Sequence, residues 1–375
     1  MHKASLRSGT WASIVARVSR VVDLETTARA FKALRRKRKI RSAEGLFRLA
    51  LMYGPGLLSL RGAAVAAGDA GIADLSDKAV EGRLRKMGDW LAHILERLLA
   101  PLASQEDGPD GGGLALSLVD GSLICAPGRG GRWRLHARYD PGRGRFTGLT
   151  LTTVKEAEHA GRTRIGAGRT VIMDRGYARV RDFRTVLAEG SDFLTRTGWR
   201  AVRLSGGAGE VIDIVALLPG DDIPLDLDVW VKGIARPSRL VIQRLPPEAA
   251  GKARRKRARK ASKAGNRLDP RTVRAAGYLI LLTSLPRGAQ PAARVVAMYP
   301  NRWQVEIGFK RLKTLGGLGQ LPAGGPDLAR TWILAHLIAA VLTDDLANEI
   351  IGFPPCAGKT GAIPQAPVGG LAKGP

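Results

Sequence analysis

A short segment near the C-terminal end of the chain carries five side chains suited to phosphate chemistry. They are Tyr299, Arg302, Glu306, Lys310 and Lys313. On a helix of 3.6 residues per turn, all five lie within about 40° of Glu306 and share one face. Cations and a phenol can contact phosphate oxygens, and a carboxylate can bind a metal ion. The segment therefore indicates a site for phosphate chemistry.

Apolar residues flank this polar face on both sides, which predicts a helix inserted into a core. They are Val305, Phe309 and Leu312 on one side and Trp303 and Ile307 on the other. Pro300 suits the first turn of such a helix. An alternative stays open, because the i, i+4 spacing of Arg302, Glu306 and Lys310 is also typical of ion pairs on a solvated helix.

Two aspartates follow apolar runs that have the form of buried strands. Asp120 ends the run that starts at residue 114, before a Gly-Ser turn, and Asp174 ends the run 169–173, before Arg-Gly-Tyr. A single Asp in such a place is typical of a turn that terminates a strand. Two of them beside Glu306 favour a constellation of three carboxylates.

The elements that must position these acids begin after a helical N-terminal region. Apolar residues recur at helical spacing from about residue 13 to residue 102. Within it, residues 59–72 and 76–85 are typical of a helix, a turn and a capped second helix, which is compatible with a helix-turn-helix that binds DNA. An ordinary helical bundle with a basic exterior fits this region equally well.

The pattern changes twice more along the chain. Residues 104–113 have the composition of a linker, and the acidic strands follow them. Beyond Asp174 we expect strands at 211–218, 227–231, 239–245 and 277–283, in an antiparallel arrangement. The basic run 252–263 interrupts them as a solvated helix or a flexible arm, and it favours contact with phosphates. The Gly/Pro-rich end predicts disorder.

The charge of the chain indicates a polyanionic partner. Its 375 residues contain 60 Lys and Arg against 33 Asp and Glu, for a net charge of +27. Nucleic acid is the usual partner of so basic a protein, and a membrane surface fits poorly because the cations are not confined to one amphipathic helix. The longest apolar run, 332–342, is too short to span a membrane and predicts a buried helix.

The cysteines and the N-terminal sequence indicate the compartment. Cys125 and Cys356 are the only cysteines, which are too few for a disulfide framework or a zinc site. Arg17 and Arg20 break the first apolar stretch, so we expect no signal peptide. We expect a protein of a reducing compartment, the cytoplasm.

Three carboxylates together suit divalent metal chemistry on a phosphodiester. Oxygen ligands select hard cations such as Mg²⁺ or Mn²⁺, and the charge of three acids can hold two of them. Two ions can activate a hydroxyl nucleophile and stabilise the leaving oxygen of an in-line transfer. Arg302 and Lys313, one and two turns from Glu306, could then contact the phosphate.

The spacing Tyr-x2-Arg-x3-Glu-x6-Lys at Tyr299, Arg302, Glu306 and Lys313 resembles the signature of the insertion-sequence transposases of family four, a group of DDE enzymes. Asp120 in Val-Asp-Gly-Ser and Asp174 in Asp-Arg-Gly-Tyr are similar to the first and second acids of that group. The resemblance extends from the helical N-terminal region to about residue 345. The Gly/Pro-rich end departs from it, because relatives continue with helical, basic sequence.

The resemblance implies an α/β fold, namely an RNase H-like catalytic core with a mixed sheet flanked by helices. The expected parts are an all-α DNA-binding domain at 1–103, a linker at 104–113, the core at 114–200 and 291–352, a β-rich insertion domain at 201–290 and a disordered tail at 353–375.

The resemblance also implies a bacterial, nucleoid-associated protein, a function and roles for the site residues. Asp120, Asp174 and Glu306 would bind two Mg²⁺ or Mn²⁺ ions, and the residues that would contact DNA are Tyr299, Arg302, Lys310 and Lys313. A homodimer would synapse two transposon ends at their terminal inverted repeats, cleave them through hairpinned ends and join them to target DNA by cut-and-paste transposition. Trp199 or Trp230 could hold a flipped base, or either could be a core residue.

Two other functions remain open from the sequence. The first is a truncated, catalytically defective transposase that acts only as a DNA-binding protein. The second is another RNase H-like nuclease, which would hydrolyse DNA without strand transfer. Cleavage and joining assays separate these alternatives from a working transposase.

Overall fold

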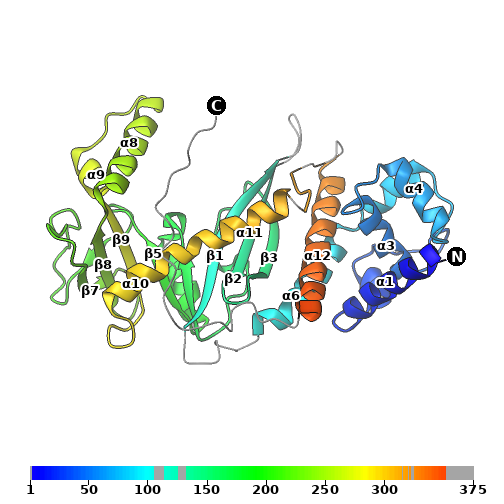
Figure 1. The fold of residues 1–375 in the computed structure, drawn as a ribbon, viewed down its shortest axis with the longest axis horizontal. Helices are drawn as coiled ribbons and strands as arrows, with labels where there is room; N and C mark the ends of the chain where they lie inside the picture. The colour runs from blue at the N-terminus through cyan, green and yellow to red at the C-terminus, as the bar shows by residue number, and fades with distance from the viewer. Residues whose placement is uncertain are drawn as a thin grey trace.

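A computed structural model describes residues 2–104, 114–125, 132–314, 316–319, 321 and 325–351. The predicted linker beyond Ser104 and the predicted tail at 353–375 lie outside these ranges, and both stay predictions. The described residues form an elongated molecule with N-terminal helices at one end and a mixed sheet that runs toward the other (Figure 1).

The N-terminal region is helical, as its apolar spacing predicts. Its helices are α1 (His2–Ser19), α2 (Leu24–Ala30), α3 (Ala43–Tyr53), α4 (Leu60–Asp69), α5 (Asp77–Leu84) and α6 (Gly88–Ser104). Ser42, Ser59 and Ser76 each accept a bond from a backbone N–H of the following helix, so local side-chain capping fixes three of the helix starts. Helices α4 and α5 occupy the two segments predicted for a helix-turn-helix.

In the part of the chain that the structure describes, nine strands form one sheet. They are β1 (Ala115–Cys125), β2 (Arg132–Asp140), β3 (Arg145–Thr153), β4 (Arg169–Met173), β5 (Asp192–Arg196), β6 (Leu204–Ser205), β7 (Leu225–Val231), β8 (Ser238–Arg244) and β9 (Tyr278–Thr283). Their order is β3-β2-β1-β4-β5-β9-β8-β7-β6. The pairs β1–β4 and β4–β5 are parallel and the other pairs are antiparallel. The expected mixed sheet is confirmed.

The central strands are buried on both faces, which explains their continuous apolar sequence. Successive residues point to opposite faces, so Leu118 and Val119 of β1 enter different clusters, as do Ile172 and Met173 of β4. One cluster joins the sheet to the N-terminal helices and to the C-terminal helices, and the other packs α7 (Val180–Ala188) against the opposite face.

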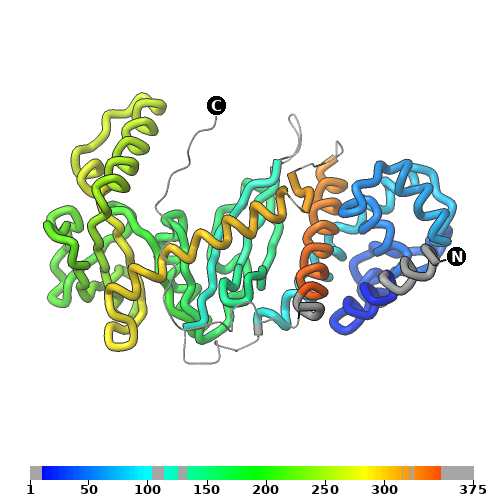
Figure 2. The backbone as a smooth tube through the Cα atoms, viewed as in Figure 1, coloured from blue at the N-terminus to red at the C-terminus, as the bar shows by residue number. Residues whose placement is uncertain are grey.

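The remaining helices position the C-terminal site residues. They are α8 (Pro247–Lys263), α9 (Pro270–Ala275), α10 (Ala292–Met298), α11 (Trp303–Thr314) and α12 (Pro326–Ile351), with the short 3₁₀ helices η1 (Ala160–Arg162), η2 (Arg175–Tyr177) and η3 (Tyr299–Arg302). Helix α11 crosses the sheet near β1 and β2, and α12 lies beside α6 between the sheet and the N-terminal helices (Figures 1 and 2). The buried helix predicted at 332–342 is confirmed within α12.

One expectation about the strand-rich interval needs correction. The strand predicted at 211–218 is wrong, because this segment makes one isolated bridge at Val211 and then a turn. The other three strands form as β7, β8 and β9 in the expected antiparallel arrangement, and they extend the central sheet from β5 by way of β9. Unsatisfied hydrogen-bonding groups at the edge of β5 explain this continuation. The basic run 252–263 lies in α8.

The sequence predicts no segment long enough to span a membrane. Among the described helices, none combines the length and the apolar composition that a bilayer crossing requires.

Candidate active site

The register of the parallel strands brings Asp120 and Asp174 together. Val119 and Met173 form the last pair between β1 and β4, and each aspartate is the next residue in the chain. Neighbouring strands lie about 4.8 Å apart, so the two acids start from adjacent points at one level of the sheet. The prediction that Asp120 precedes a turn is wrong, because β1 continues to Cys125 by pairing with β2.

Local hydrogen bonds orient both aspartates. Asp120 accepts a bond from the N–H of Gly121 at 2.8 Å. Asp174 leaves β4 and caps the 3₁₀ helix η2 by accepting a bond from the N–H of Gly176 at 2.6 Å. Its backbone carbonyl accepts a bond from the hydroxyl of Thr195 on β5 at 3.0 Å. Asp174 is thus a turn residue, as its type favours, and also a neighbour of Asp120.

Tyr299 and Arg302 occupy the 3₁₀ helix η3, and the α-helix begins only at Trp303. The expectation of one continuous α-helix is therefore wrong at its start. The shared face survives, because residues i and i+3 eclipse one another in a 3₁₀ helix. Pro300 lies in the first turn of η3, as predicted.

Arg302 joins the carboxylates of two different elements. Its guanidinium lies 3.5 Å from Asp120 Oδ2 and donates a bond of 2.6 Å to Glu306 Oε1. The Arg302 side chain is 20% exposed, so water screens these ion pairs only partly. The ion pair between Arg302 and Glu306 at i, i+4, which is also expected of a solvated helix, is present. Arg302 also links Glu306 to Asp120.

The acids influence one another electrostatically. Burial raises the pKa of Asp120 to about 6, and the negative charges of Asp174 and Glu306 act in the same direction. The bond from Gly121 and the charge of Arg302 oppose this rise. The structure therefore brings together all three acids that the sequence indicates, although they come from β1, the end of β4 and α11.

The predicted phosphate contacts divide into two groups. Tyr299 is partly buried, and burial raises the pKa of its phenol, while the nearby guanidinium of Arg302 opposes the rise. Lys313 is partly buried near Cys125, and burial lowers the pKa of its ammonium. Lys310 is exposed on α11. Tyr299 and Arg302 thus lie beside the acids, whereas Lys313 lies near the far end of β1.

Only one of the two predicted apolar flanks of α11 is covered. Val305, Phe309 and Leu312 are buried, and the ring of Phe309 lies 5.8 Å from that of Phe146 on β3. Trp303 is 61% exposed and Ile307 is 39% exposed, so the second flank does not enter the core. This flank stays exposed because α11 packs on one face of the sheet and no described element lies over its other side.

The two tryptophans considered for a flipped base have different surroundings. Trp199 lies between two guanidinium groups, with Arg200 at 4.0 Å and Arg271 at 4.4 Å from the ring centroid. Its indole N–H donates to the hydroxyl of Thr272 at 3.2 Å. Trp230, on β7, is 40% exposed. The ring of Trp199 is therefore already stacked, and that of Trp230 is more open.

The three acidic side chains are of the ligand type that divalent metal ions prefer. Asp120, Asp174 and Glu306 offer only carboxylate oxygens, which suit Mg²⁺ and Mn²⁺. Burial raises the pKa of Asp120, the charges of Asp174 and Glu306 add to this rise, and a bound cation would oppose it. Within the described ranges, no three acidic, His or Cys side chains already surround one point as ligands. Arg302 supplies the positive charge between Asp120 and Glu306 in this arrangement.

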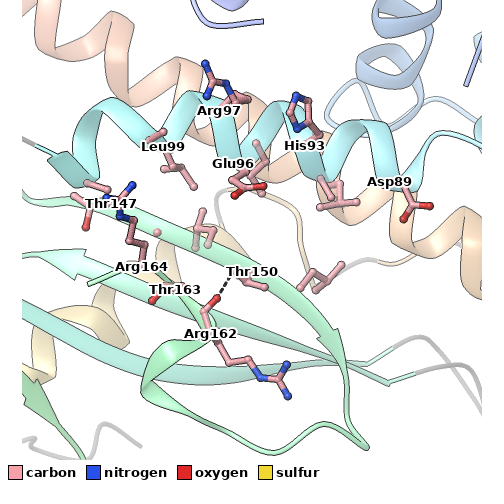
Figure 3. A pocket seen from close by; sticks show the side chains of 18 of the residues that line it. Asp89, His93, Glu96, Arg97, Leu99, Thr147, Thr150, Arg162, Thr163 and Arg164 are labelled. Atoms are coloured by element: carbon pink, nitrogen blue, oxygen red, sulfur yellow. Dashed lines mark hydrogen bonds between the residues drawn. The ribbon is translucent and has the colours of Figure 1, made fainter. Parts of the chain in front are cut away.

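A cavity of about 620 Å³ lies away from these acids, between α6 and β3. Its lining includes both acidic and basic side chains, among them Glu96, Arg97 and Arg164 (Figure 3). The hydroxyl of Thr150 donates to the backbone carbonyl of Arg162 in its wall. The cavity contains none of the predicted site residues, so the candidate active site stays at the three acids.

A mixed sheet that presents three carboxylates beside a phenol and basic groups defines a class of enzyme that transfers phosphoryl groups on a polyanion. Comparison with known proteins identifies the family. The model of the transposase DDE domain family matches residues 112–342. The chain is 37% identical to the InsL protein of insertion sequence element IS186B of Escherichia coli, over 92% of this chain and 96% of the relative.

A second relative gives the same result. The chain is 37% identical to the transposase of insertion sequence element IS421 of Escherichia coli, again over 92% of this chain and 96% of the relative. The chain belongs to the DDE transposases of insertion sequences. It is therefore an enzyme that acts on DNA, and membership of this family carries a general dependence on divalent metal ions.

Proposed function

We propose that this transposase binds the terminal inverted repeats of its insertion sequence, cleaves the DNA there and joins the ends to target DNA by cut-and-paste transposition. One observation carries the proposal. Asp120 and Asp174 lie at one level of adjacent parallel strands, and Arg302 links Glu306 to Asp120. The signature spacing from Tyr299 to Lys313 supports assignment to family four.

Each site residue has a role that follows from its position. Asp120, Asp174 and Glu306 would bind the metal ions, of which we propose two, Mg²⁺ or Mn²⁺. When bound, these ions activate the attacking hydroxyl and stabilise the leaving oxygen. Arg302 can donate to a phosphate oxygen in place of its present carboxylate partners, and Tyr299 can donate its phenolic proton to a second oxygen. These contacts would orient the scissile phosphate.

The lysines and the basic helix extend the proposed DNA-binding surface. Lys310 is exposed and Lys313 is partly buried on the same helix, so they would contact phosphates farther from the acids. Helix α8 carries the basic run 252–263, which would contact the phosphate backbone. Trp230 is the more open candidate for stacking on a flipped base. We propose a homodimer that holds two ends in a synaptic complex.

Removal of any one acid should abolish cleavage. The substrate is DNA from either side of the coding region that contains a matched inverted repeat, and the products are nicked and joined strands on a denaturing gel. Asp120→Ala, Asp174→Ala and Glu306→Ala should each reduce the rate by at least about a thousandfold, because loss of one ligand removes electrostatic stabilisation of the transition state. Asp228→Asn, a change of an exposed acid on β7, should cleave normally.

The same assay distinguishes the alternatives. Cleavage that persists without one of the three acids would refute their assignment. Binding of the repeats with no cleavage under Mg²⁺ or Mn²⁺ would indicate a defective, DNA-binding transposase. Cleavage without joining of a labelled 3′-hydroxyl end would indicate a nuclease.

A further inference from the structure

A fourth carboxylate, that of Glu158, lies against the two strand-end acids. Glu158 follows β3 in the chain, and no sequence pattern marks it. A Cβ placed on Gly121, the residue after Asp120, would lie 2.9 Å from Glu158 Oε1. A Cβ placed on Gly176, which donates to Asp174, would lie 3.6 Å from Glu158 Oε2. The carboxylate therefore lies between the backbone segments that carry Asp120 and Asp174.

Basic groups hold Glu158 in this place. Arg134 Nε lies 3.5 Å from Glu158 Oε1, and Arg181 donates to the backbone carbonyl of Glu158 at 3.2 Å. The other end of the Arg134 guanidinium donates to the backbone carbonyl of Glu156. The Glu158 side chain remains 35% exposed, so it is anchored at its base and accessible at its tip.

A buried hydroxyl beside these acids supplies an independent observation. The Tyr177 side chain is 1% exposed, and its hydroxyl has no hydrogen-bond partner among the described atoms. Burial raises the pKa of this phenol, and the charges of Glu158, Asp120 and Asp174 raise it further, in that order. Buried polar groups without a protein partner commonly bind ordered water. Water around a cation held by these carboxylates would satisfy the Tyr177 hydroxyl.

We propose that Glu158 is a fourth acid of the active site and binds a divalent cation together with Asp120 and Asp174, directly or through a bound water molecule. The Glu158 carboxylate lies against Gly121 and Gly176, next to both aspartates, and a hard cation would compensate their like charges with the ligand type that it prefers. The need for space explains Gly121, because any side chain there would displace the Glu158 carboxylate. The proposal rests on the proposed function of Asp120 and Asp174.

Direct measurement of metal binding tests the proposal without relying on catalysis. The full chain, freed of metal by a chelator, is titrated with Mn²⁺ while electron paramagnetic resonance records the free ion. Glu158→Gln keeps the shape of the side chain and removes its charge, and it should weaken Mn²⁺ binding about ten- to a hundredfold. The matched control is Glu156→Gln, which removes a neighbouring acid that pairs with Arg162 instead and should leave the affinity unchanged.

A second variant separates a role in metal binding from a role in folding. Gly121→Ala retains the Glu158 charge but fills the place of its carboxylate, so it should also weaken Mn²⁺ binding. Thermal unfolding in chelator reports any loss of stability. A Glu158→Gln protein that unfolds at a lower temperature but binds Mn²⁺ with wild-type affinity would show that Glu158 only pairs with Arg134, and would overturn the proposal.

Asp120→Asn distinguishes failure of this proposal from failure of the proposed function. If Asp120→Asn loses Mn²⁺ binding while Glu158→Gln retains it, the three-acid site stands and the fourth acid is refuted. If Asp120→Asn also binds Mn²⁺ with wild-type affinity, both assignments are refuted.

Discussion

At the scale of single residues, the candidate active site places carboxylates near one another, which destabilises the metal-free protein. Asp120 is partly buried, lies near Asp174 and Glu306, and has a pKa raised to about 6. An unfolded aspartate has a pKa of about 3.9. Between these two pH values the folded protein binds more protons than the unfolded chain, so the free energy of unfolding falls as pH rises. Above about pH 6 the Asp120 carboxyl is ionised in both states, and the full decrease in the free energy of unfolding is present.

Asp120→Asn should therefore stabilise the chelator-treated protein at pH 7 and above. The amide keeps the size of the side chain and removes the buried charge, and the expected gain is on the order of 2 kcal/mol. Urea unfolding measures it. The gain should shrink as the pH falls from about 6 toward about 4, where the wild-type carboxyl takes up its proton in both states. If the Asp120→Asn variant were less stable than the wild type at pH 7, the Asp120 charge would not be destabilising and the prediction would be wrong.

At the scale of elements, two helices present cations in different ways. Helix α11 is held by one buried flank, and its polar face starts at the acids and extends toward the end of β1. Helix α8 has a largely exposed basic surface at the end of the sheet where β7, β8 and β9 lie (Figure 1). Cations that are exposed and close together contribute more to binding a polyanion than to folding.

Neutralising part of α8 should weaken DNA binding without unfolding the protein. The variant combines Arg255→Gln, Arg259→Gln and Lys260→Gln, three exposed positions of this helix. If each contacts one phosphate, the slope of log affinity against log salt should decrease in magnitude by about 2.7. Fluorescence anisotropy at several salt concentrations measures the slope, and thermal unfolding serves as the control. An unchanged slope would place the DNA away from α8.

At the scale of the whole molecule, the N-terminal helices and the catalytic sheet share one hydrophobic core. Leu46 of α3, Leu118 of β1 and Trp332 of α12 belong to the same buried cluster. Polar contacts also join α12 to the N-terminal helices. Arg330 pairs with Asp89 at 2.7 Å, and the Thr331 hydroxyl donates to the backbone carbonyl of Leu84. Helix α12 therefore connects the predicted domain 1–103 to the catalytic core.

Loss of the central side chain of α12 should destabilise both regions together. Trp332 is 2% exposed, so Trp332→Ala should lower the free energy of unfolding by about 3–5 kcal/mol. Hydrogen exchange should show similar losses of protection in α3 and β4. Trp230→Ala, which truncates a tryptophan that is 40% exposed, should have a much smaller effect. Loss of protection in α3 alone would show that the N-terminal helices form an independent domain.

Short segments of the sequence predicted which residues lie together at the candidate active site. Asp120 and Asp174 follow apolar runs that form buried parallel strands, and the spacing around Glu306 brings Tyr299 and Arg302 to one face even though η3 replaces the first α-helical turn. Periodicity succeeds here because strand and helix geometry depend on neighbouring residues. The net charge of +27 also indicated a nucleic acid partner, because the net charge is set by composition and does not depend on the fold.

Only the tertiary structure decided which surfaces meet. Local periodicity gave α11 two apolar flanks, but the single sheet face beneath it covers Phe309 and leaves Trp303 exposed. The approach of Glu158 to the segments that carry Asp120 and Asp174, and the ion pair between Arg302 and Asp120, join residues far apart in the chain. No local pattern encodes such contacts, because they depend on how strand order and helix docking fold the chain back on itself.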